Sequence, residues 1–503
     1  MEPPYFSELL FTARGGNDKI EAKRTKQRAY CSNRRQGACG SDCMKNKKCM
    51  GCRKESCDGC SLSPAVKIKT SKETVGEGFF LPEDEGLSGL GIAFDVGTTT
   101  IAAMLWDLKE RRQLAVRSSV NPQRAAGSDV ISRIAYAGKS RENARHLQDL
   151  LVRKMDELAR DMTQLPVSRV SVVGNTAMCE ILLGLSLEGL SGAPFHKEYR
   201  GTAERRGSEL GFSFLAGAQV LVLPSIEGYV GADALAVYTW VRHQDGRSNV
   251  LAVDIGTNGE VLLLGQKNIY ACSTAAGPAL EGAAVRQGMG AVPGAVESVA
   301  LSGSFPRQDL FCRTIGDAPP KGICGSGLVD ALAVLAKARV IDAGGYLPDA
   351  GEARKRGAPE LICRRLDAHE GENRILLTNP EHPVFLTAGD IRQLQLAKGA
   401  VRAGIEVLLD REGIRGEDLE HIYLAGAFGS YINIQSALAV GLLPKVPAER
   451  ITHTGNCAGQ GAVMALFSQR VVKEMEEEAF GISHVELAGQ ELFQELFVRY
   501  MGF

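Results

Sequence analysis

The sequence predicts an α/β protein of two related lobes that follow a small cysteine-rich segment. Three observations lead to this fold class. An apolar stretch that runs into Asp-x-Gly-Thr occurs twice, at Asp95 and at Asp254, 159 positions apart. From residue 89 onward, strand-like apolar stretches alternate with helical patterns, which is typical of α/β domains. Seven of the 13 cysteines lie within residues 31–60.

Composition divides the chain into four parts. Residues 1–70 are rich in Lys, Arg, Gly and Ser and lack apolar periodicity, so they cannot build a hydrophobic core of their own. Residues 71–88 form a linker rich in Gly and Glu. The two predicted lobes follow at 89–249 and 250–503. The distance between the two Asp-x-Gly-Thr copies suits a duplicated α/β domain better than a solenoid.

Hydrophobic periodicity predicts the strands and helices of both lobes. The strands that it predicts are 168–173, 219–223, 250–255 and 421–424. The helices that it predicts are 144–164, 326–337, 388–412 and 459–478. The polar stretch 344–373 is expected to be an excursion on the surface.

Each Asp-x-Gly-Thr copy combines residue types that bind a metal–phosphate complex. An aspartate at the end of a strand can hold hydrated Mg²⁺. Glycine lets backbone N–H groups approach phosphate oxygens, and threonine hydroxyls add donors. A single copy is often an ordinary β-turn, so only the pair predicts a site that holds a nucleoside triphosphate from both sides. The candidate residues are Asp95, Gly97, Thr98, Thr99, Asp254, Gly256, Thr257 and Asn258.

Two glycine-containing segments follow or precede predicted elements in positions that suit anion binding. Gly174 and Asn175 directly follow the predicted strand 168–173. Gly325 and Gly327 precede a predicted helix, where backbone N–H groups can bind an anion. The alternative for this second segment is a simple helix start with Ser326 as its cap.

Further polar and glycine-rich positions are candidates for the nucleotide and for catalysis. Gly426 and Gly429 end a predicted strand, where the chain either accommodates an adenosine or makes a tight turn into a helix. Glu281 is either a polar group of the site or part of a structural turn. Glu260 and Asp233 are further candidates for a catalytic base.

Composition argues against several classes of partner. The chain has 58 basic and 59 acidic residues, so no net field favours nucleic acid or an acidic membrane. Aromatic residues make up only 6%, and no run of 18 apolar residues occurs. The N-terminus lacks the pattern of a secretory signal. We therefore expect a cytoplasmic protein whose clustered cysteines bind metal instead of forming disulfides.

The order of these segments resembles the fold shared by acetate and sugar kinases, actin and the activators of hydroxyacyl-CoA dehydratases. That family has phosphate 1, connect 1, phosphate 2, connect 2 and adenosine segments in this order. The resemblance implies duplicated RNase H-like lobes that bind ATP and Mg²⁺, with the two Asp-x-Gly-Thr turns at the phosphate and metal positions. It places Gly426 and Gly429 at the adenosine position. The candidate catalytic residues are Asp95, Asp254 and Glu281.

A narrower resemblance is to the ATP-dependent reductive activators of corrinoid proteins. It depends on five segments that occur together, namely 254–260, 276–282, 322–327, 395–400 and 426–429. Such proteins use ATP to drive an electron onto Co(II) cobalamin, which restores Co(I) for methyl transfer. The resemblance implies a corrinoid protein of a methyltransferase system as partner, and a low-potential electron donor such as ferredoxin or flavodoxin.

The N-terminal cysteines depart from the [2Fe–2S] domain that is usual in that family. The spacing Cys52-x₄-Cys57-x₂-Cys60 is of the plant ferredoxin type, yet no apolar strands surround it and no fourth cysteine follows at a suitable distance. With Cys49 these thiolates could hold either an iron–sulfur cluster, which we expect to be [4Fe–4S], or structural Zn²⁺. The predicted metal ligands are Cys31, Cys39, Cys43, Cys49, Cys52, Cys57 and Cys60. The other six cysteines are expected to be buried as small hydrophobic side chains.

We therefore expect an ATP hydrolase that is coupled to low-potential electron transfer. The electron would enter through the N-terminal cluster, and ATP-driven closure of two lobes would change the surroundings of the cobalt. The alternatives are a small-molecule kinase, a zinc-bearing regulatory ATPase and an activator of a radical dehydratase. A kinase needs no cysteine cluster, and radical activators usually bridge one cluster across a dimer with two cysteines per subunit.

Overall fold

The computed structural model describes residues 81–503, with the exception of residues 84, 194, 257 and 430. All of these residues belong to one of the two units into which the chain divides, Ala65–Phe503. The predicted segment 1–70 and residues 71–80 of the predicted linker lie outside the described residues.

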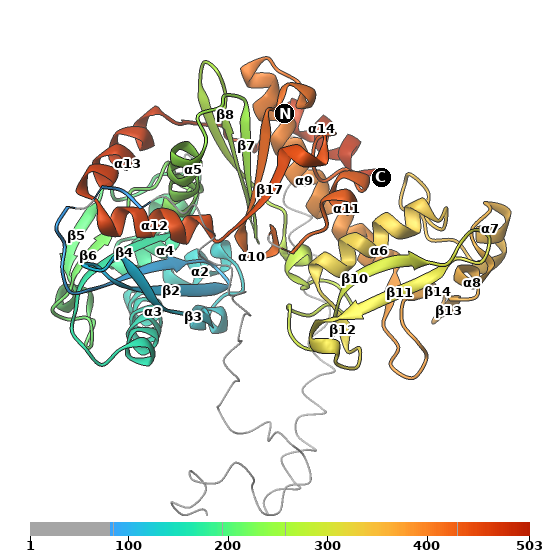
Figure 1. Cartoon of the computed structure of the whole chain (residues 1–503), viewed down its shortest axis with the longest axis horizontal. Coiled ribbons are helices and arrows are strands. Elements are labelled where there is room, and N and C mark those ends of the chain that lie inside the picture. The colour runs from blue at the N-terminus through green and yellow to red at the C-terminus, as the bar shows by residue number, and fades with distance from the viewer. Residues whose placement is uncertain (1–80, 84, 194, 257, 430) are drawn as a thin grey trace, which may run out of the picture. The chain divides into compact units, whose positions relative to one another are not determined.

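The first lobe is built on a mixed six-stranded sheet with the order β3-β2-β1-β4-β6-β5 (Figure 1). Strand β1 pairs antiparallel with β2 and parallel with β4, and Val96 at the end of β1 lies opposite Gly174 at the end of β4. Asp95 is therefore at the carboxyl edge of the sheet. The strands are β1 (Leu90–Val96), β2 (Thr100–Asp107), β3 (Arg112–Val120), β4 (Val167–Gly174), β5 (Ala203–Arg206) and β6 (Gln219–Val222).

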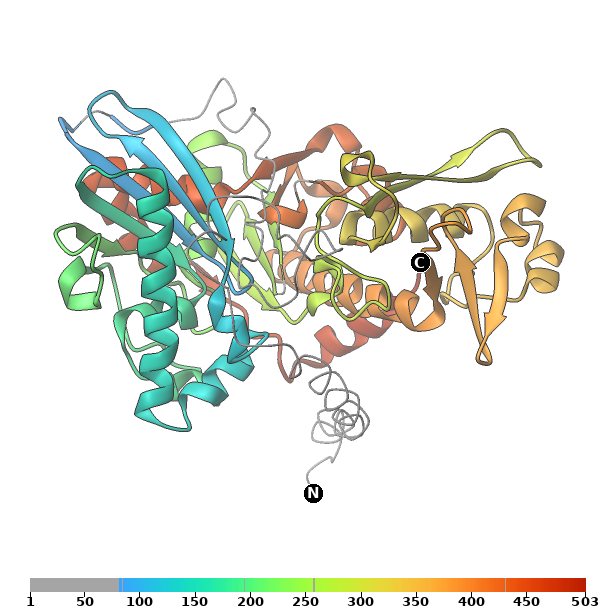
Figure 2. The same ribbon diagram turned by 90° about the horizontal axis from the view of Figure 1, so that it is seen from below.

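Four α-helices complete this lobe. The longest, α3, packs along the sheet against β2 and β3 (Figure 2) and begins after Ser140, whose side chain accepts a hydrogen bond from the N–H of Asn143. It buries Leu147, Leu151 and Met155 completely, and it confirms the predicted amphipathic helix 144–164 with a shift of two or three residues at its ends. The helices are α2 (Val130–Ala137), α3 (Arg141–Met162), α4 (Thr176–Leu183) and α5 (Ala232–Gln244).

The second lobe repeats this arrangement with the strand order β17-β16-β7-β8-β9-β18. Strand β7 pairs antiparallel with β8 and parallel with β16, as β1 does with β2 and β4. Asp254, like Asp95, is the penultimate residue of its strand. The topology thus confirms the duplicated lobes. The strands are β7 (Val250–Ile255), β8 (Gly259–Leu264), β9 (Ile269–Thr274), β16 (His421–Ala425), β17 (Ile451–Gly455) and β18 (Ser483–His484).

Two three-stranded sheets and further helices belong to the same lobe. The additional strands are β10 (Ala295–Ser302), β11 (Asp309–Thr314), β12 (Gly322–Ile323), β13 (Leu366–His369), β14 (Glu372–Leu376) and β15 (Phe385–Thr387). The helices are α6 (Gly325–Lys337), α7 (Ala350–Lys355), α8 (Glu360–Cys363), α9 (Ala388–Glu412), α10 (Gly426–Gly429), α11 (Ile434–Ala439), α12 (Cys457–Phe467), α13 (Gln469–Gly481) and α14 (Glu491–Met501). Two short 3-10 helices matter below, η3 (Pro122–Ala125) and η6 (Pro278–Glu281).

Two expectations about this lobe are wrong. The helix expected over 459–478 is two helices, because Ser468 adopts an extended backbone conformation that ends α12 and its side chain caps α13. The stretch 344–373 is more than an excursion on the surface. It forms α7, α8 and β13, and it buries Ala353, Ile362 and Cys363 completely in the core of the second lobe.

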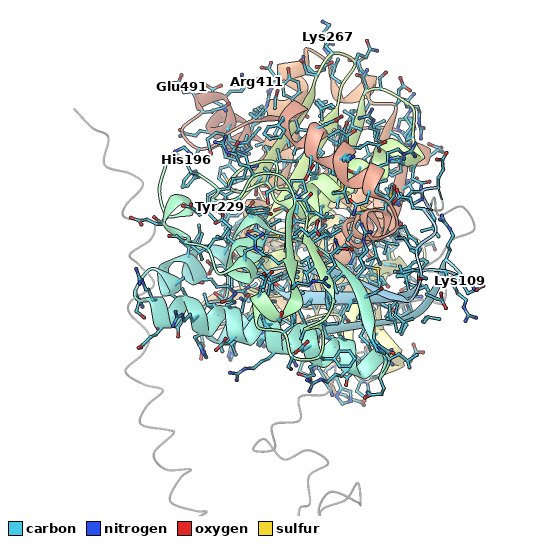
Figure 3. The ribbon with its side chains drawn as sticks, turned by 90° about the vertical axis from the view of Figure 1, so that its left-hand side faces the viewer. Lys109, His196, Tyr229, Lys267, Arg411 and Glu491 are labelled. Atoms are coloured by element: carbon cyan, nitrogen blue, oxygen red, sulfur yellow. The ribbon has the colours of Figure 1, made fainter. Side chains whose placement is uncertain are left out.

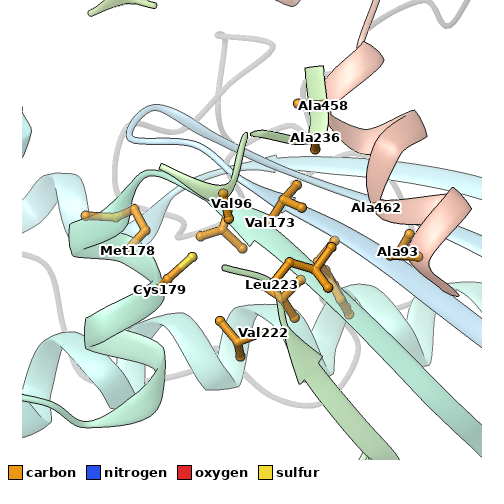
Figure 4. Close-up of a cluster of buried hydrophobic side chains, with 14 of the residues drawn as sticks. Ala93, Val96, Val173, Met178, Cys179, Val222, Leu223, Ala236, Ala458 and Ala462 are labelled. Atoms are coloured by element: carbon orange, nitrogen blue, oxygen red, sulfur yellow. The ribbon is translucent and has the colours of Figure 1, made fainter. Parts of the chain in front are cut away.

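Helix α12 follows the last long strand of the second lobe but packs against the first lobe. It contacts β1, β4 and α5, and the hydroxyl of Ser171 on β4 donates to the carbonyl of Ala462 at 2.7 Å. Figure 4 shows Ala458 and Ala462 of α12 in one buried cluster with Ala93 and Val173 of the first sheet. Helix α12 therefore connects the last long strand of the second lobe to the hydrophobic core of the first lobe.

The surface of the described residues carries charges of both signs. Lys109, Lys267, Arg411 and Glu491 extend outwards from loops and helix ends (Figure 3). Among the described residues, no helix combines the length and the apolar character that crossing a membrane requires.

Candidate functional site

The two Asp-x-Gly-Thr copies form tight turns at the carboxyl ends of the two central strands. In the first turn the N–H of Gly97 donates to the carbonyl of Thr100 at 2.9 Å. In the second, the N–H of Gly256 donates to the carbonyl of Asn258 at 3.1 Å. Thr257 lies outside the described residues.

Four partly buried carboxylates gather around these strand ends. Asp95 and Asp254 come from the central strands, Glu260 lies opposite Asp254 on β8, and Asp233 lies in the first turn of α5. Burial raises the pKa of Asp95 to about 6. Burial, followed by repulsion from the neighbouring carboxylates, raises the pKa of Asp233 to about 7 and that of Asp254 to about 8. The same two causes raise the pKa of Glu260 well above its ordinary value.

This donor set fits a hydrated magnesium ion with bound phosphates. The raised pKa values show that the carboxylates repel one another, and a divalent cation would offset that repulsion. Within the described part of the chain, no three His, Cys, Asp or Glu side chains converge on a single metal position. Mg²⁺ keeps several waters and takes one or two carboxylates together with substrate phosphates.

Side chains from the second half of the sequence hydrogen-bond to the first turn and to the strand that precedes it. The hydroxyl of Thr99 donates to Glu281 of η6, at 3.0 Å to Oε2 and 3.3 Å to Oε1. The side-chain amide of Asn456, at the N-cap of α12, donates to Asp95 Oδ2 at 2.8 Å. The structure thus places Glu281 beside the phosphate turn of the opposite lobe.

The segment after β4 lies directly beside the first turn. A Cβ at Gly174 would approach the carbonyl oxygen of Val96 to 2.5 Å, so glycine permits the close approach of β4 to β1 here. Asn175 is almost fully buried, and its side-chain oxygen accepts from the N–H of Ala177 at 3.0 Å as the cap of α4. The side chain of Asn175 therefore holds the start of a helix at the edge of the site.

Gly325 and Gly327 lie at the buried start of α6. A Cβ at Gly325 would come within 1.8 Å of the carbonyl oxygen of Leu280, and one at Gly327 within 2.1 Å of that of Val296. The expected cap by Ser326 is wrong, because its hydroxyl donates to the carbonyl of Glu297 and Cys324 is the N-cap residue. Gly325 therefore lets α6 pack closely against η6, the helix that carries Glu281, and Gly327 lets it pack closely against β10.

Gly426 adopts a left-handed conformation, with a φ of 82°, beside Asp254. A Cβ at this position would lie 2.2 Å from Asp254 Oδ1, so only glycine allows β16 to end next to the carboxylate. Gly429 follows three residues later, and its carbonyl oxygen lies 2.5 Å from Nδ1 of His453. The predicted adenosine segment is thus in direct contact with the second aspartate.

The predicted residues within the described part of the chain lie together at or beside the carboxyl ends of β1, β4, β7 and β16. A cavity of about 740 Å³ on the second lobe is lined instead by residues such as Lys398, Arg402 and Lys445, and none of the predicted site residues lines it. The seven predicted metal-binding cysteines lie outside the described residues. The other six are free thiols, of which five are buried as expected and Cys312 is half-buried.

Sequence reasoning missed three polar residues that support the site. They are Asn456 beside Asp95, and Asn121 and Arg133 behind the first turn. Asn456 follows strand β17 as the other site residues follow theirs, so the same pattern of a polar residue after an apolar strand indicates it. Arg133 lies within a helix 35 residues from its partner Thr98, and no local signal marks that contact.

Comparison with known proteins follows the same division of the chain. A family model described as the RACo middle region matches residues 90–244, and one described as the C-terminal domain of RACo, the ASKHA domain, matches residues 248–503. This chain belongs to the RACo family. The predicted fold of duplicated lobes in the acetate and sugar kinase/actin class is thereby confirmed, as is the resemblance to ATP-dependent reductive activators of corrinoid proteins.

Two relatives and one solved structure are similar to this RACo family member. The chain is 33% identical to the corrinoid activation enzyme RamQ of Eubacterium limosum, over 83% of this chain and 71% of that protein. It is 26% identical to a [Co(II) methylated amine-specific corrinoid protein] reductase of Methanosarcina barkeri, over 81% and 76%. A solved structure of a reductive activator for a corrinoid, iron–sulfur protein matches with a TM-score of 0.73 and 29% identity. That match covers 83% of this chain and 66% of the other.

Proposed function

We propose that this chain is a reductive activator that uses ATP hydrolysis to return the Co(II) form of a corrinoid protein to Co(I). The observation that carries the proposal is the pair of facing Asp-x-Gly-Thr turns within a chain of the RACo family. The names of the relatives, a corrinoid activation enzyme and a Co(II) corrinoid protein reductase, support the same acceptor. They favour it over the small-molecule kinase and the dehydratase activator.

In this proposal the residues of the two turns hold the triphosphate and its metal. Asp95 and Asp254 orient a hydrated Mg²⁺, which would neutralise phosphate charge during transfer to water. Thr98, Thr99 and the turn glycines supply hydroxyl and backbone N–H donors. The carboxylate of Glu281 is a candidate for orienting the attacking water, since it already accepts a hydrogen bond from Thr99.

ATP acts on the electron transfer by changing how the two lobes meet. The Thr99–Glu281 bond crosses between the lobes at the turn itself, and the Asn456–Asp95 bond ties α12 to the strand before the turn, so a triphosphate placed there would alter both. A rearrangement that removes an axial ligand from the cobalt, or excludes water from it, would raise the Co(II)/Co(I) potential toward that of the donor.

Helix α12 gives this rearrangement a route toward the N-terminal segment. At its start, Asn456 holds Asp95 at the nucleotide site. At its end, about 16 Å away for 11 residues, the hydroxyl of Ser468 donates to Glu85 at 2.7 Å. Glu85 also accepts from the N–H of Gln469, and it lies in the linker that leads from the cysteine-rich segment. Movement of α12 would therefore reach the described end of that linker.

We extend the proposal to the seven N-terminal cysteines, which lie outside the described residues. Thiolates are the ligands of iron–sulfur clusters, and a [4Fe–4S] cluster there would supply a one-electron carrier between a ferredoxin or flavodoxin and the corrinoid. Because the surrounding sequence is polar, metal binding would also supply its folding energy. Iron and acid-labile sulfide in anaerobically prepared protein support this extension, whereas about one zinc per chain without iron would contradict it.

Phosphate release tests the proposed function. We expect the chain to transfer phosphate from ATP to water, and to do so faster when the Co(II) form of a corrinoid protein is added, because the bound corrinoid protein would favour the arrangement of the two lobes in which the triphosphate reacts. The Asp254→Asn variant should show neither activity. Transfer of phosphate to a small-molecule acceptor, with no response to the corrinoid protein, would favour a kinase.

A further inference from the structure

Arg133 of α2 is fully buried directly behind the first phosphate turn. Its Nη2 donates to the carbonyl of Thr98 at 2.6 Å, and its Nε donates to the carbonyl of Gly127 at 3.0 Å. Its Nη1 lies 3.3 Å from Gln123 Oε1 and 3.2 Å from the sulfur of Met178. Burial lowers its pKa to about 10, so the guanidinium is charged at neutral pH.

Asn121 and Gln123 extend this contact into a buried polar network. The side-chain amide of Asn121 donates to the carbonyl of Gly97 at 2.9 Å, and the backbone N–H of Asn121 donates to the carbonyl of Thr99 at 2.9 Å. Its side-chain oxygen accepts from the N–H of Gln123, whose own side chain is bonded to Arg133. Three consecutive carbonyls of the turn are therefore held by one network in which every side chain is buried.

Because peptide bonds are planar, these hydrogen bonds also fix the direction in which the N–H groups of the turn point. In a trans peptide the C=O and the next N–H point to opposite sides. Because Asn121 holds the carbonyl of Gly97 and Arg133 holds that of Thr98, the N–H groups of Thr98 and Thr99 face away from the network. They present a pair of donors of the kind that binds phosphate oxygens.

The positive charge of Arg133 also favours phosphate binding at this turn. The nearby carboxylate of Asp129 compensates this buried charge only in part, since the groups that hydrogen-bond to the guanidinium are carbonyls, an amide and a thioether. An anion on the opposite side of the Thr98–Thr99 peptide would compensate it, because the peptide dipole between them points its positive end at the anion. The cost of burying Arg133 is thus offset when phosphate binds.

We propose that Arg133 is a positioning residue for the triphosphate. It fixes the carbonyl of Thr98, aims the N–H of Thr99 at a phosphate, and places a positive charge behind the turn without touching the nucleotide. This inference rests on the proposed ATP-dependent function.

The test compares nucleotides that do and do not carry phosphates. Dissociation constants of Mg-ATP and of adenosine are measured by calorimetry for the wild-type chain and for Arg133→Met. We expect the constant for Mg-ATP to rise about tenfold or more, as for a lost charge-assisted bond, and that for adenosine to change by less than about twofold. An Arg133→Lys variant keeps the charge but cannot make the three bonds at once, so its affinity for Mg-ATP should be intermediate.

Arg169→Met is the matched control. Arg169 is also a nearly buried arginine of the first lobe, but it lies opposite Gly91 at the amino end of β4, away from the turn. Its replacement should leave both constants unchanged. Equal loss of ATP and adenosine affinity in both Arg133 variants would show a merely structural role and overturn the inference, as would an unchanged affinity for Mg-ATP. A wild-type chain that fails to bind Mg-ATP would overturn the proposed function itself.

Discussion

Single residues around the carboxyl ends of the two central strands determine the electrostatics of the candidate site. The central aspartates Asp95 and Asp254 are partly buried beside Asp233 and Glu260; burial raises all four pKa values, and repulsion between carboxylates adds to it for all except Asp95. Gly426 brings the end of β16 against Asp254 because no side chain intervenes. The site is therefore prepared for a cation that binds together with phosphates.

Replacement of Asp254 by Asn should abolish ATP hydrolysis while the fold remains intact. The amide keeps the shape of the side chain but loses the charge that orients hydrated Mg²⁺, so we expect steady-state turnover to fall about 100-fold or more. In the absence of Mg²⁺ the variant should unfold at or above the wild-type temperature, because one repelling carboxylate is gone. The exposed Asp367→Asn serves as control. Turnover within about threefold of wild type would contradict the assignment.

Glu180 should make the stability of the first lobe depend on pH. Its side chain is fully buried, its Oε2 has no hydrogen-bond partner among the described residues, and burial raises its pKa to about 7. The folded state therefore retains a proton that the unfolded chain loses near pH 4.5, and the resulting stability is lost as the pH rises through about 7.

The Glu180→Gln variant cannot ionise and should lack this dependence. Urea unfolding at several pH values should show that its free energy of unfolding, relative to that of the wild type, rises by about 2 kcal/mol between pH 4 and pH 8. Glu360→Gln is the control: hydrogen bonds from Arg354 and Arg364 lower the pKa of Glu360 to about 2, so this exposed carboxylate stays ionised in the folded chain over that range and its replacement should give no such gain. Parallel curves for wild type and Glu180→Gln would contradict the expectation.

At the scale of elements, the sequence predicts best where local signals agree. Helix α9 matches the expected 388–412 at both ends, because Thr387 forms a capping box with Asp390 and Gly413 ends the helix in a left-handed conformation. Strand β7 matches 250–255 for a similar reason, since its apolar run stops at a glycine turn. The sequence also indicated the segments that contain Gly97, Gly174, Gly256, Gly325 and Gly426, because each directly follows a strand or precedes a helix.

Prediction fails where tertiary contacts decide the local structure. Residues 459–478 carry one continuous helical pattern, yet Ser468 breaks it because its hydroxyl bonds Glu85, more than 380 residues earlier in the chain. The stretch 344–373 is mostly polar, so the few side chains that it buries form no recognisable hydrophobic pattern. Arg133 and Asn121 bond to the first turn only after the lobe has folded. These contacts leave no periodicity in the sequence.

Ser468→Ala should therefore destabilise the junction of α12 and α13. The variant loses the cap on the N–H of Val471 and the bond to Glu85, so we expect unfolding to become easier by about 1 kcal/mol in urea. Amide exchange should increase at the start of α13 and remain unchanged in α3. Ser208→Ala, on an exposed 3-10 helix, is the control. An unchanged unfolding midpoint would argue against the role of this cap.

At the scale of the whole molecule, α12 contacts two positions of the N-terminal part of the described chain, each more than 350 residues away in the sequence. Asn456 at its start contacts Asp95, and Ser468 at its end contacts Glu85 in the linker. The helix packs on the first lobe although it follows the strands of the second. The candidate nucleotide site and Glu85 of the linker therefore contact opposite ends of one element.

Glu85→Ala should impair reduction of the corrinoid protein but leave ATP hydrolysis nearly unchanged. It removes three hydrogen bonds at the start of α13 but touches no residue of the nucleotide site, so ATP hydrolysis should stay within about twofold of wild type. ATP-dependent reduction of the corrinoid protein should fall about tenfold, because the linker no longer follows α12. Glu83→Ala, two residues away and exposed, is the matched control. Equal effects of both variants on reduction would exclude a specific role for Glu85.

The absorption spectrum of a Co(II) corrinoid protein, mixed anaerobically with the reduced chain, tests the central claim most directly. The account predicts that the Co(I) spectrum develops with Mg-ATP and does not develop with ADP, with a non-hydrolysable ATP analogue, or with Mg-ATP and the Asp254→Asn variant. Formation of Co(I) at the same rate and to the same extent without nucleotide would contradict an activator driven by ATP hydrolysis.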